Sequence, residues 1–284
     1  MGKWILIGLA VIVLITVFAV MVGRARETTR LTRLVDKLID RSSAPDVNVV
    51  DFDSLSGLPP PVIRYFKHVL AKNQKLIKIV RMHQSGVLRT NMKIDAWSSF
   101  TADQIVVPFA NGFVWNAKVE MPLGTHIRVL DTYSAGVGSG RISLLSAVAV
   151  ASNSGEPKLN SAALQRYLAE AVWYPTALLP QSGVVWTAID ERSAMATLTD
   201  SGITVSLEFR FNDANEVTAI YSSGRFARFD GGYKQLPWEG HFLNYQDRGG
   251  ISIPIYGEVG WYEDETLYLV WKGNLKDSQY QLGE

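Results

Sequence analysis

The chain has 284 residues, with 28 Lys and Arg against 27 Asp and Glu, so its formal charge is +1. This balance argues against a nucleic-acid-binding protein, which typically carries a basic excess. The absence of cysteine excludes disulfide scaffolds, thiolate metal sites and cysteine nucleophiles. Hydrophobic residues make up 47% of the chain and charged residues only 19%, which excludes an intrinsically disordered protein.

Residues 4–22 form an apolar segment without a single charge, in which only Gly8 and Thr16 are not strongly apolar. As a helix these 19 residues would span roughly 28 Å, close to the hydrocarbon core of a bilayer. A cleaved signal peptide is the alternative, but its apolar core is shorter and ends at a small-residue cleavage site that is missing here. We therefore expect residues 1–23 to be an uncleaved single transmembrane anchor and the protein to be a single-pass membrane protein.

The charges beside this segment bear on membrane orientation. Arg24, Arg26, Arg30 and Arg33 follow it, whereas Lys3 precedes it. By the positive-inside rule, the arginines favour a cytoplasmic C-terminal part.

Residues 24–41 have the pattern of an amphipathic helix. Leu31, Leu34, Val35, Leu38 and Ile39 fall on one helical stripe. Two interpretations remain open: a helical stalk that continues from the anchor, or a helix on the membrane surface or against a partner helix. The segment has a formal charge of +3, suited to anionic headgroups. With the polar linker 42–57, it forms a predicted stalk and linker over residues 24–57.

The remainder, residues 58–284, is predicted to be a single antiparallel β-rich domain. A helix is expected from Pro60 or Pro61 to Ala71, because proline is tolerated in a first helical turn. A second helix is expected with Asn160 or Ser161 as its N-cap and Pro175 at its end. Alternating patterns predict strands at residues 77–88, 93–100, 104–109, 113–121, 126–133, 141–151, 184–190, 194–199, 204–211, 217–228, 238–245, 253–261 and 266–275.

Strands this contiguous pair antiparallel, since parallel neighbours need long crossovers. The predicted fold class is mainly β with a few helices. The N-terminal transmembrane helix is followed by a large curved antiparallel sheet, a half-open β-barrel, with one inserted helix.

Familiar catalytic motifs are missing. Gly136, Gly138 and Gly140 are not followed by a helix or by Gly-Lys-Ser/Thr, so we expect a glycine-lined turn or a close backbone approach rather than a nucleotide site. The four histidines lie 15 or more residues apart, so no metal site is predicted. No Gly-x-Ser-x-Gly elbow appears, and no cofactor is expected.

Residues 166–176 are the most distinctive segment. Arg166 and Glu170 share a helical face, either as a surface ion pair or as part of a lid whose aromatic end closes an apolar cavity. Tryptophans in the strands suit cross-strand packing or a cavity lining. The candidate ligand-binding residues are Trp97, Trp115, Asp131, Tyr133, Arg166, Glu170, Trp173, Tyr174 and Trp186.

Several segments together resemble a bacterial family of domains of unknown function that is often attached to transmembrane segments. The resemblance spans residues 58–280 and implies no catalytic residue, because the family has no established activity. Its segments are Leu58-Pro59-x-x-Val62-x-Arg64-Tyr65, Phe100-Thr101-Ala102-x-Gln104, Phe113-x-Trp115-x-Ala117, Asp131-x-Tyr133-x-x-Gly136-x-Gly138, Arg166-Tyr167-Leu168-Ala169-Glu170-x-x-Trp173-Tyr174-Pro175, Pro237-Trp238-x-Gly240 and Ile253-Pro254.

The order of elements is also similar to that of the half-open β-barrels of bacterial lipoprotein carriers and related lipid-binding domains. That resemblance implies helices at the mouth of a curved sheet, acyl chains on its concave face, and an extracytoplasmic location. The extracytoplasmic location implied by this resemblance is opposite to the cytoplasmic location that the arginine count favours. Fold alone does not establish function.

The leading hypothesis is a membrane-anchored module that binds an apolar or lipid-like ligand on the concave face of the sheet. One alternative is an enzyme acting on a membrane-proximal substrate, in which Arg64, Asp131, Tyr133, Arg166 and Glu170 would have to meet in one cavity. A second is a structural or interaction protein that uses the 31–39 stripe. The membrane is the expected partner, nucleic acid is not, and protein partners are undefined.

Overall fold

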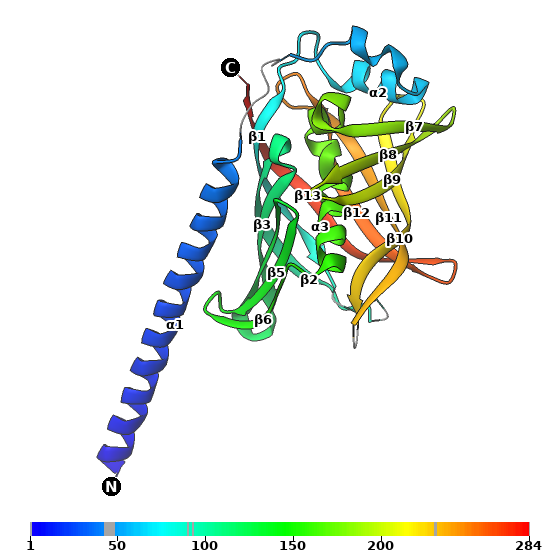
Figure 1. The fold of residues 1–284 in the computed structure, drawn as a ribbon. Helices are drawn as coiled ribbons and strands as arrows, with labels where there is room; N and C mark the ends of the chain where they lie inside the picture. The colour runs from blue at the N-terminus through cyan, green and yellow to red at the C-terminus, as the bar shows by residue number, and fades with distance from the viewer. Residues whose placement is uncertain (1, 43–48, 90, 93, 230–231, 284) are drawn as a thin grey trace.

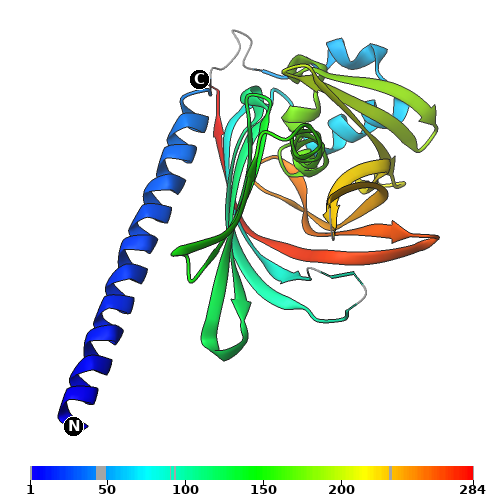
Figure 2. The same ribbon diagram turned by 60° about the horizontal axis from the view of Figure 1, so that its bottom comes forward.

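A computed structural model describes residues 2–42, 49–89, 91–92, 94–229 and 232–283. The described chain forms one 13-stranded sheet in the order β6-β5-β4-β3-β2-β1-β13-β12-β11-β10-β9-β8-β7, and every strand pairing in it is antiparallel. The sheet curls into a half-barrel with a helix inside the curl (Figure 1; Figure 2). The predicted fold class is confirmed.

The strands are β1 (Ile77–Leu88), β2 (Ser98–Val107), β3 (Gly112–Met121), β4 (Thr125–Ser134), β5 (Val137–Leu144), β6 (Val148–Ser154), β7 (Val184–Asp190), β8 (Ser193–Asp200), β9 (Ile203–Phe211), β10 (Val217–Phe229), β11 (Gly232–Asp247), β12 (Ser252–Glu263) and β13 (Thr266–Leu282). The helices are α1 (Gly2–Ile39), α2 (Pro60–Val69) and α3 (Pro157–Glu170). Short 3-10 turns lie at η1 (Asp53–Gly57), η2 (Pro108–Ala110), η3 (Pro122–Gly124), η4 (Ala171–Trp173), η5 (Pro175–Leu178) and η6 (Pro180–Ser182).

The sheet consists of two meanders that meet at its centre. β1 to β6 form one and β7 to β13 the other, and β1 pairs with β13 from Ile77↔Leu282 to Leu88↔Trp271. The first and last strands of the domain are therefore neighbours in the middle of the sheet.

Helix α3 lies on the concave face, and its start differs from the prediction. The helix begins at Pro157, whose missing N–H costs nothing in a first turn, and Glu156 precedes it. Asn160 is inside the helix, and its Oδ1 accepts a hydrogen bond from the Gly138 backbone N–H at 2.8 Å. The predicted cap at Asn160 or Ser161 is wrong because the Asn160 side chain binds the sheet instead of its own helix.

Gly138, in the glycine-rich segment, allows α3 to approach the backbone of the sheet closely. A Cβ added to Gly138 would lie 2.9 Å from the Leu159 carbonyl oxygen and 2.9 Å from the Ala163 Cβ. Gly136 has a positive φ of 79° in the β4–β5 turn, which glycine adopts without strain. The expectation of a turn with a close backbone approach is confirmed.

Two strand predictions are wrong in their segmentation. Parts of the two predicted strands 93–100 and 104–109 form one strand, β2 (Ser98–Val107). Residues 94–97 precede this strand, residues 108–109 belong to η2, and residue 93 lies outside the described residues. The register with β1 runs unbroken from Leu88↔Ser98 to Val80↔Val106. The polar residues Thr101 and Asp103 are simply its exposed face.

The predicted strand 141–151 is two strands, β5 and β6, joined by a tight turn. Leu145 and Ser146 both have positive φ, of 53° and 56°. Such turns usually contain glycine or asparagine, so the sequence carries no signal for this one.

Helix α1 is continuous over 38 residues and lies outside the half-barrel (Figure 2). By length and composition it is long and apolar enough to cross a membrane, and its apolar window is fully uncovered by the rest of the protein. The stripe Leu31–Ile39 packs against the convex face of the sheet, on Ile79, Val107, Ala110, Val114 and Leu130. The protein's own sheet therefore occupies the stripe that the interaction hypothesis assigned to a partner.

An ion pair fixes α1 to the sheet. Arg141 on β5 donates from Nε to both carboxylate oxygens of Glu27 at 3.1 Å and from Nη2 at 2.6 Å. The Glu27 side chain is only 6% exposed, and its hydrogen bond from Arg141 lowers its pKa.

Replacing Glu27 by glutamine is expected to loosen α1 from the sheet, because Arg141 loses the charge that compensates its burial. We expect the free energy that holds α1 on the sheet to fall by about 2 kcal/mol. This is below the range for fully buried ion pairs, because the Arg141 side chain is still partly exposed to solvent. Hydrogen exchange of residues 27–39 measures this change, and Glu120→Gln, at an exposed position near the end of β3, is the control. Because the pKa of Glu27 is lowered, its contribution is present above the ordinary glutamate pKa and is lost as the pH falls through the lowered value. Unchanged exchange in Glu27→Gln would contradict the expectation.

Candidate functional site

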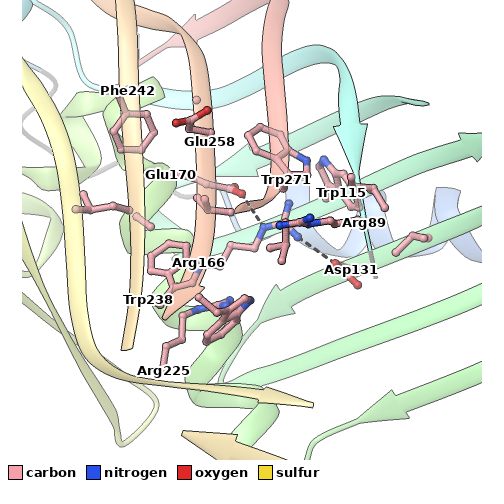
Figure 3. Close-up of a pocket in the computed structure, with 18 of the residues that line it drawn as sticks. Arg89, Trp115, Asp131, Arg166, Glu170, Arg225, Trp238, Phe242, Glu258 and Trp271 are labelled. Carbon is pink, nitrogen blue, oxygen red and sulfur yellow. Dashed lines mark hydrogen bonds and ion pairs between the residues drawn. The ribbon is translucent and has the colours of Figure 1, made fainter. Parts of the chain in front are cut away.

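A cavity of about 340 Å³ lies between α3 and the concave face of the sheet. Figure 3 shows its charged and aromatic residues facing one another. The lining consists of Leu88, Arg89, Trp115, Ile127, Val129, Asp131, Ile142, Arg166, Ala169, Glu170, Trp173, Ile220, Arg225, Trp238, Phe242, Gly257, Glu258, Val259, Trp261, Val270 and Trp271. Most of these residues are aliphatic or aromatic, and the volume is at the lower end of the ~300–1,000 Å³ typical of small-molecule sites.

Arg166 organises the polar side of the cavity. Its Nε donates to Glu170 Oε1 at 2.6 Å, one turn along α3, and its Nη1 donates to Asp131 Oδ2 on β4 at 3.0 Å. The guanidinium also lies over the rings of Trp115 and Phe113, at 4.7 and 5.1 Å from their centroids. Electrostatic, cation–π and packing contacts thus hold one arginine between helix and sheet.

A chain of hydrogen bonds extends from this pair along the sheet. Trp115 Nε1 donates to Gln84 Oε1, and Gln84 Nε2 donates to Gln104 Oε1, both at 2.9 Å. Gln104 Nε2 then donates to Glu170 Oε2 at 2.6 Å. Both oxygens of Glu170 therefore accept hydrogen bonds from other side chains of the protein.

The pKa shifts follow from this arrangement. Burial raises the pKa of Asp131, although the neighbouring Arg166 acts in the opposite direction. Burial opposes the charge of Arg166 as well, but Glu170 and Asp131 outweigh it and raise the pKa of that guanidinium.

Arg225 on β10 is the second arginine deep in the site. Its guanidinium lies 4.8 Å from the Trp238 ring and 5.2 Å from the Trp261 ring. Its Nη2 donates to the Ala162 carbonyl oxygen at 3.1 Å. Burial, and next the charge of Arg166, lower the pKa of Arg225 to about 10.

Five of the nine candidate residues from the sequence line the cavity. They are Trp115, Asp131, Arg166, Glu170 and Trp173. Trp173 donates its indole N–H to the Pro254 carbonyl oxygen at 3.0 Å and packs edge-on against Phe242. The Arg166–Glu170 pair is a cavity element rather than a pair on the outer surface.

The other four candidates lie outside this lining. The Arg89 guanidinium lies over the ring of Trp97, at 4.8 Å from its centroid. The hydroxyl of Tyr133 donates to Asp200 Oδ2 at 2.7 Å, and that of Tyr174 to the Tyr167 carbonyl oxygen at 2.8 Å. Trp186 is a core residue whose indole N–H donates to the Leu178 carbonyl oxygen.

The five residues that the enzyme hypothesis requires do not all lie in one cavity. Asp131, Arg166 and Glu170 converge, but Tyr133 does not, and Arg64 on α2 binds Asn215 Oδ1 and the Glu191 carbonyl oxygen. The described lining contains no serine, threonine, histidine or lysine. Among the described residues no group of three or more histidines and carboxylates is placed to hold a metal ion.

Several lining residues were missed as site residues in the sequence, chiefly Arg225, Arg89, Phe242, Glu258, Trp238, Trp261 and Trp271. A weak signal exists for some of them. Gly257, Val259 and Trp261 alternate along β12, and Trp238 is paired with Trp261 across the β11–β12 ladder. That pattern predicts a shared face, although it does not tell which face is hollow.

Comparison with known proteins places the chain in context. No curated protein matches it significantly in sequence. Among solved structures, a LolA superfamily protein from Nitrosomonas europaea is similar over 80% of this chain and 94% of that chain, with 7% identity and a TM-score of 0.42. A beta-barrel-like protein of domain of unknown function DUF1849 from Brucella abortus is similar over 72% of this chain and 98% of that chain, with 12% identity and a TM-score of 0.22. Residues 56–280 match a family of unknown function over most of the chain, and the protein therefore belongs to the DUF6920 family.

Proposed function

We propose that this protein is a membrane-anchored binding module that holds an apolar or lipid-like ligand in the cavity between α3 and the sheet. The observation that carries the proposal is the lining: an aliphatic and aromatic hollow whose main acidic groups are already bound to Arg166. Such a surface gains free energy by covering an apolar chain, at about 25 cal/mol per Å² removed from water. The small volume favours a single chain over a multi-chain lipid.

The membrane is the source of ligand in this proposal. Residues 1–23 act as the anchor, residues 24–57 as stalk and linker, and residues 58–284 as the binding domain. The anchor contacts the sheet at the point where its apolar segment ends: Arg24 Nε donates to the Leu145 carbonyl oxygen at 2.9 Å, in the β5–β6 turn. A Cβ on Gly23 would lie only 2.6 Å from the Ala147 carbonyl oxygen.

In this proposal, the contact brings one end of the half-barrel to the bilayer surface. The β5–β6 hairpin exposes Leu144, Val148 and Val150, which are 42%, 57% and 60% exposed. Figure 1 shows this hairpin and the β10–β11 hairpin at the end of the domain toward which the N-terminal half of α1 projects. Leu88, Ile142 and Trp261, from the strand ends at this side, line the cavity, so a chain leaving the bilayer has a short path into it.

Photolabelling of the full-length protein in phosphatidylcholine vesicles tests the proposal. The probe is a long-chain fatty alcohol with a diazirine in its chain, and the labelled peptides are mapped by mass spectrometry. We expect labels on β4, β12, β13 and α3 in addition to α1. Val129→Trp, which fills the cavity, is expected to remove the labels inside the domain.

The matched control is Val185→Trp, whose position on β7 is 64% exposed and away from the cavity. It is expected to keep the labels. Labelling confined to α1 in the unmodified protein, or labelling that Val129→Trp leaves unchanged, would refute the proposed function.

A further inference from the structure

Arg225 differs from the other charged residues of the cavity because no described carboxylate lies within ion-pair distance of it; Asp131 and Glu170 attract it only at longer range. It forms no ion pair with any residue of the described chain, and its Nε is fully buried without a hydrogen-bond partner. Within the described part of the chain, its one hydrogen bond runs from Nη2 to the Ala162 carbonyl oxygen. A buried charged donor that stays unpaired costs free energy that a bound anion would recover.

The remaining charges of the lining are already engaged. Arg166 binds both Asp131 and Glu170. Arg89 donates to the Leu269 carbonyl oxygen and lies 3.5 Å from Asp95. Glu258 accepts from the Tyr256 hydroxyl at 2.7 Å and lies 3.4 Å from His241 Nδ1.

The surroundings of Arg225 suit a ligand headgroup. Trp238 and Trp261 flank the guanidinium and hold it in place, which reduces the entropy lost when it binds an anion. Arg225 is near the end of β10 at Phe229. Figure 3 shows it beside Trp238, on the opposite side of the cavity from Phe242.

We propose that the cavity binds an amphiphile with one anionic group, a phosphate or a carboxylate, which Arg225 contacts while the apolar chain fills the space toward Phe242 and Trp173. This inference rests on the proposed function, because it assigns a headgroup to the same ligand. The lowered pKa of Arg225, about 10, still leaves the guanidinium protonated at neutral pH. A charge-assisted contact of this kind is stronger than a neutral hydrogen bond.

Competition against the neutral photolabel tests the headgroup separately from the chain. Full-length protein in phosphatidylcholine vesicles is labelled in the presence of hexadecyl phosphate, hexadecanol or inorganic phosphate. The readout is the amount of competitor that halves the labelling of the domain. We expect hexadecyl phosphate to compete about tenfold better than hexadecanol, equivalent to about 1.4 kcal/mol, and inorganic phosphate not to compete.

Arg225→Gln is expected to abolish this preference, so that hexadecyl phosphate and hexadecanol compete equally. A circular dichroism spectrum that matches that of the unmodified protein shows that the variant is folded. Arg228→Gln, at an exposed position on the same strand, is the matched control and is expected to keep the tenfold preference. It accounts for any general effect of charge at the vesicle surface.

Equal competition by hexadecyl phosphate and hexadecanol in the unmodified protein would overturn the anionic headgroup and leave the proposed function standing. A preference that survives Arg225→Gln would overturn the role of Arg225. Competition by inorganic phosphate as strong as that by hexadecyl phosphate would overturn the amphiphile in favour of a free anion. Complete absence of labelling in the domain would refute the proposed function itself.

Discussion

Replacing Arg166 by methionine is expected to destabilise the folded protein by about 3 kcal/mol. The change leaves Asp131 and Glu170 facing each other at the cavity without the cation that both bind, and removing one partner of a buried pair costs roughly 3–5 kcal/mol. We expect the lower end because Asp131 is 36% exposed and keeps contact with water. Urea unfolding of the full-length protein in detergent, followed by circular dichroism, measures the loss.

Two further variants make this result specific. Arg192→Met removes an ion pair with Asp213 in which the side chains are 68% and 83% exposed, and we expect a loss of less than ~0.5 kcal/mol. Combining Arg166→Met with Asp131→Asn and Glu170→Gln removes the stranded charges and is expected to restore most of the stability. If the Arg166→Met protein were as stable as the unmodified one, Arg166 would not be compensating the buried charges of Asp131 and Glu170.

The Arg166→Met deficit is also expected to depend on pH. Arg166 counteracts the burial that raises the pKa of Asp131, so removing the guanidinium raises that pKa further. An acid with a raised pKa binds its proton more tightly in the folded state than in the unfolded state. The deficit is therefore largest at neutral pH and shrinks as the pH falls through the raised value, which unfolding series at several pH values measure.

Replacing Trp173 by alanine is expected to cost about 3–5 kcal/mol, the usual range for deleting a large buried aromatic side chain. Trp173 is 3% exposed and packs against Phe242 and Trp271, with centroids at 6.0 and 6.3 Å. The change also removes its hydrogen bond to Pro254 and enlarges the cavity. The variant is therefore expected to bind bulkier chains while it unfolds at lower urea concentration.

Trp97→Ala is the control for this variant, because Trp97 is only half-buried and lies outside the cavity. Its expected loss is about 1 kcal/mol. If the two tryptophan variants lost equal stability, the structural role assigned to Trp173 would be wrong.

The sequence predicts the elements of this fold better than their boundaries. Alternation identified most strands because one face of each is buried. It failed where the chain lacked turn residues, as at Leu145–Ser146, and where exposed polar residues imitated a turn, as at Thr101 and Asp103. The N-cap of α3 was misplaced because Asn160 hydrogen-bonds to a strand that is distant in sequence.

Some residues of the candidate site could be identified from the sequence and others could not. Arg166 and Glu170 could be paired from the sequence because they are one helical turn apart. Arg225 could not be found, since its neighbours Trp238, Trp261 and Ala162 come from three separate elements. The stripe on α1 was recognised as apolar, yet only the structure shows that the sheet covers it.

The central position of β13 has a consequence for synthesis on the ribosome. β1 must wait for residues 271–282 before its second edge is covered, so an open, hydrogen-bonding edge persists until those residues have been synthesised. Contacts between such distant parts of a chain also form slowly. Val270 and Trp271 complete the cavity only at that stage. In the proposed arrangement the anchor enters the bilayer while the domain is still unfinished, so the nascent chain is tethered beside the membrane before it can hold any ligand.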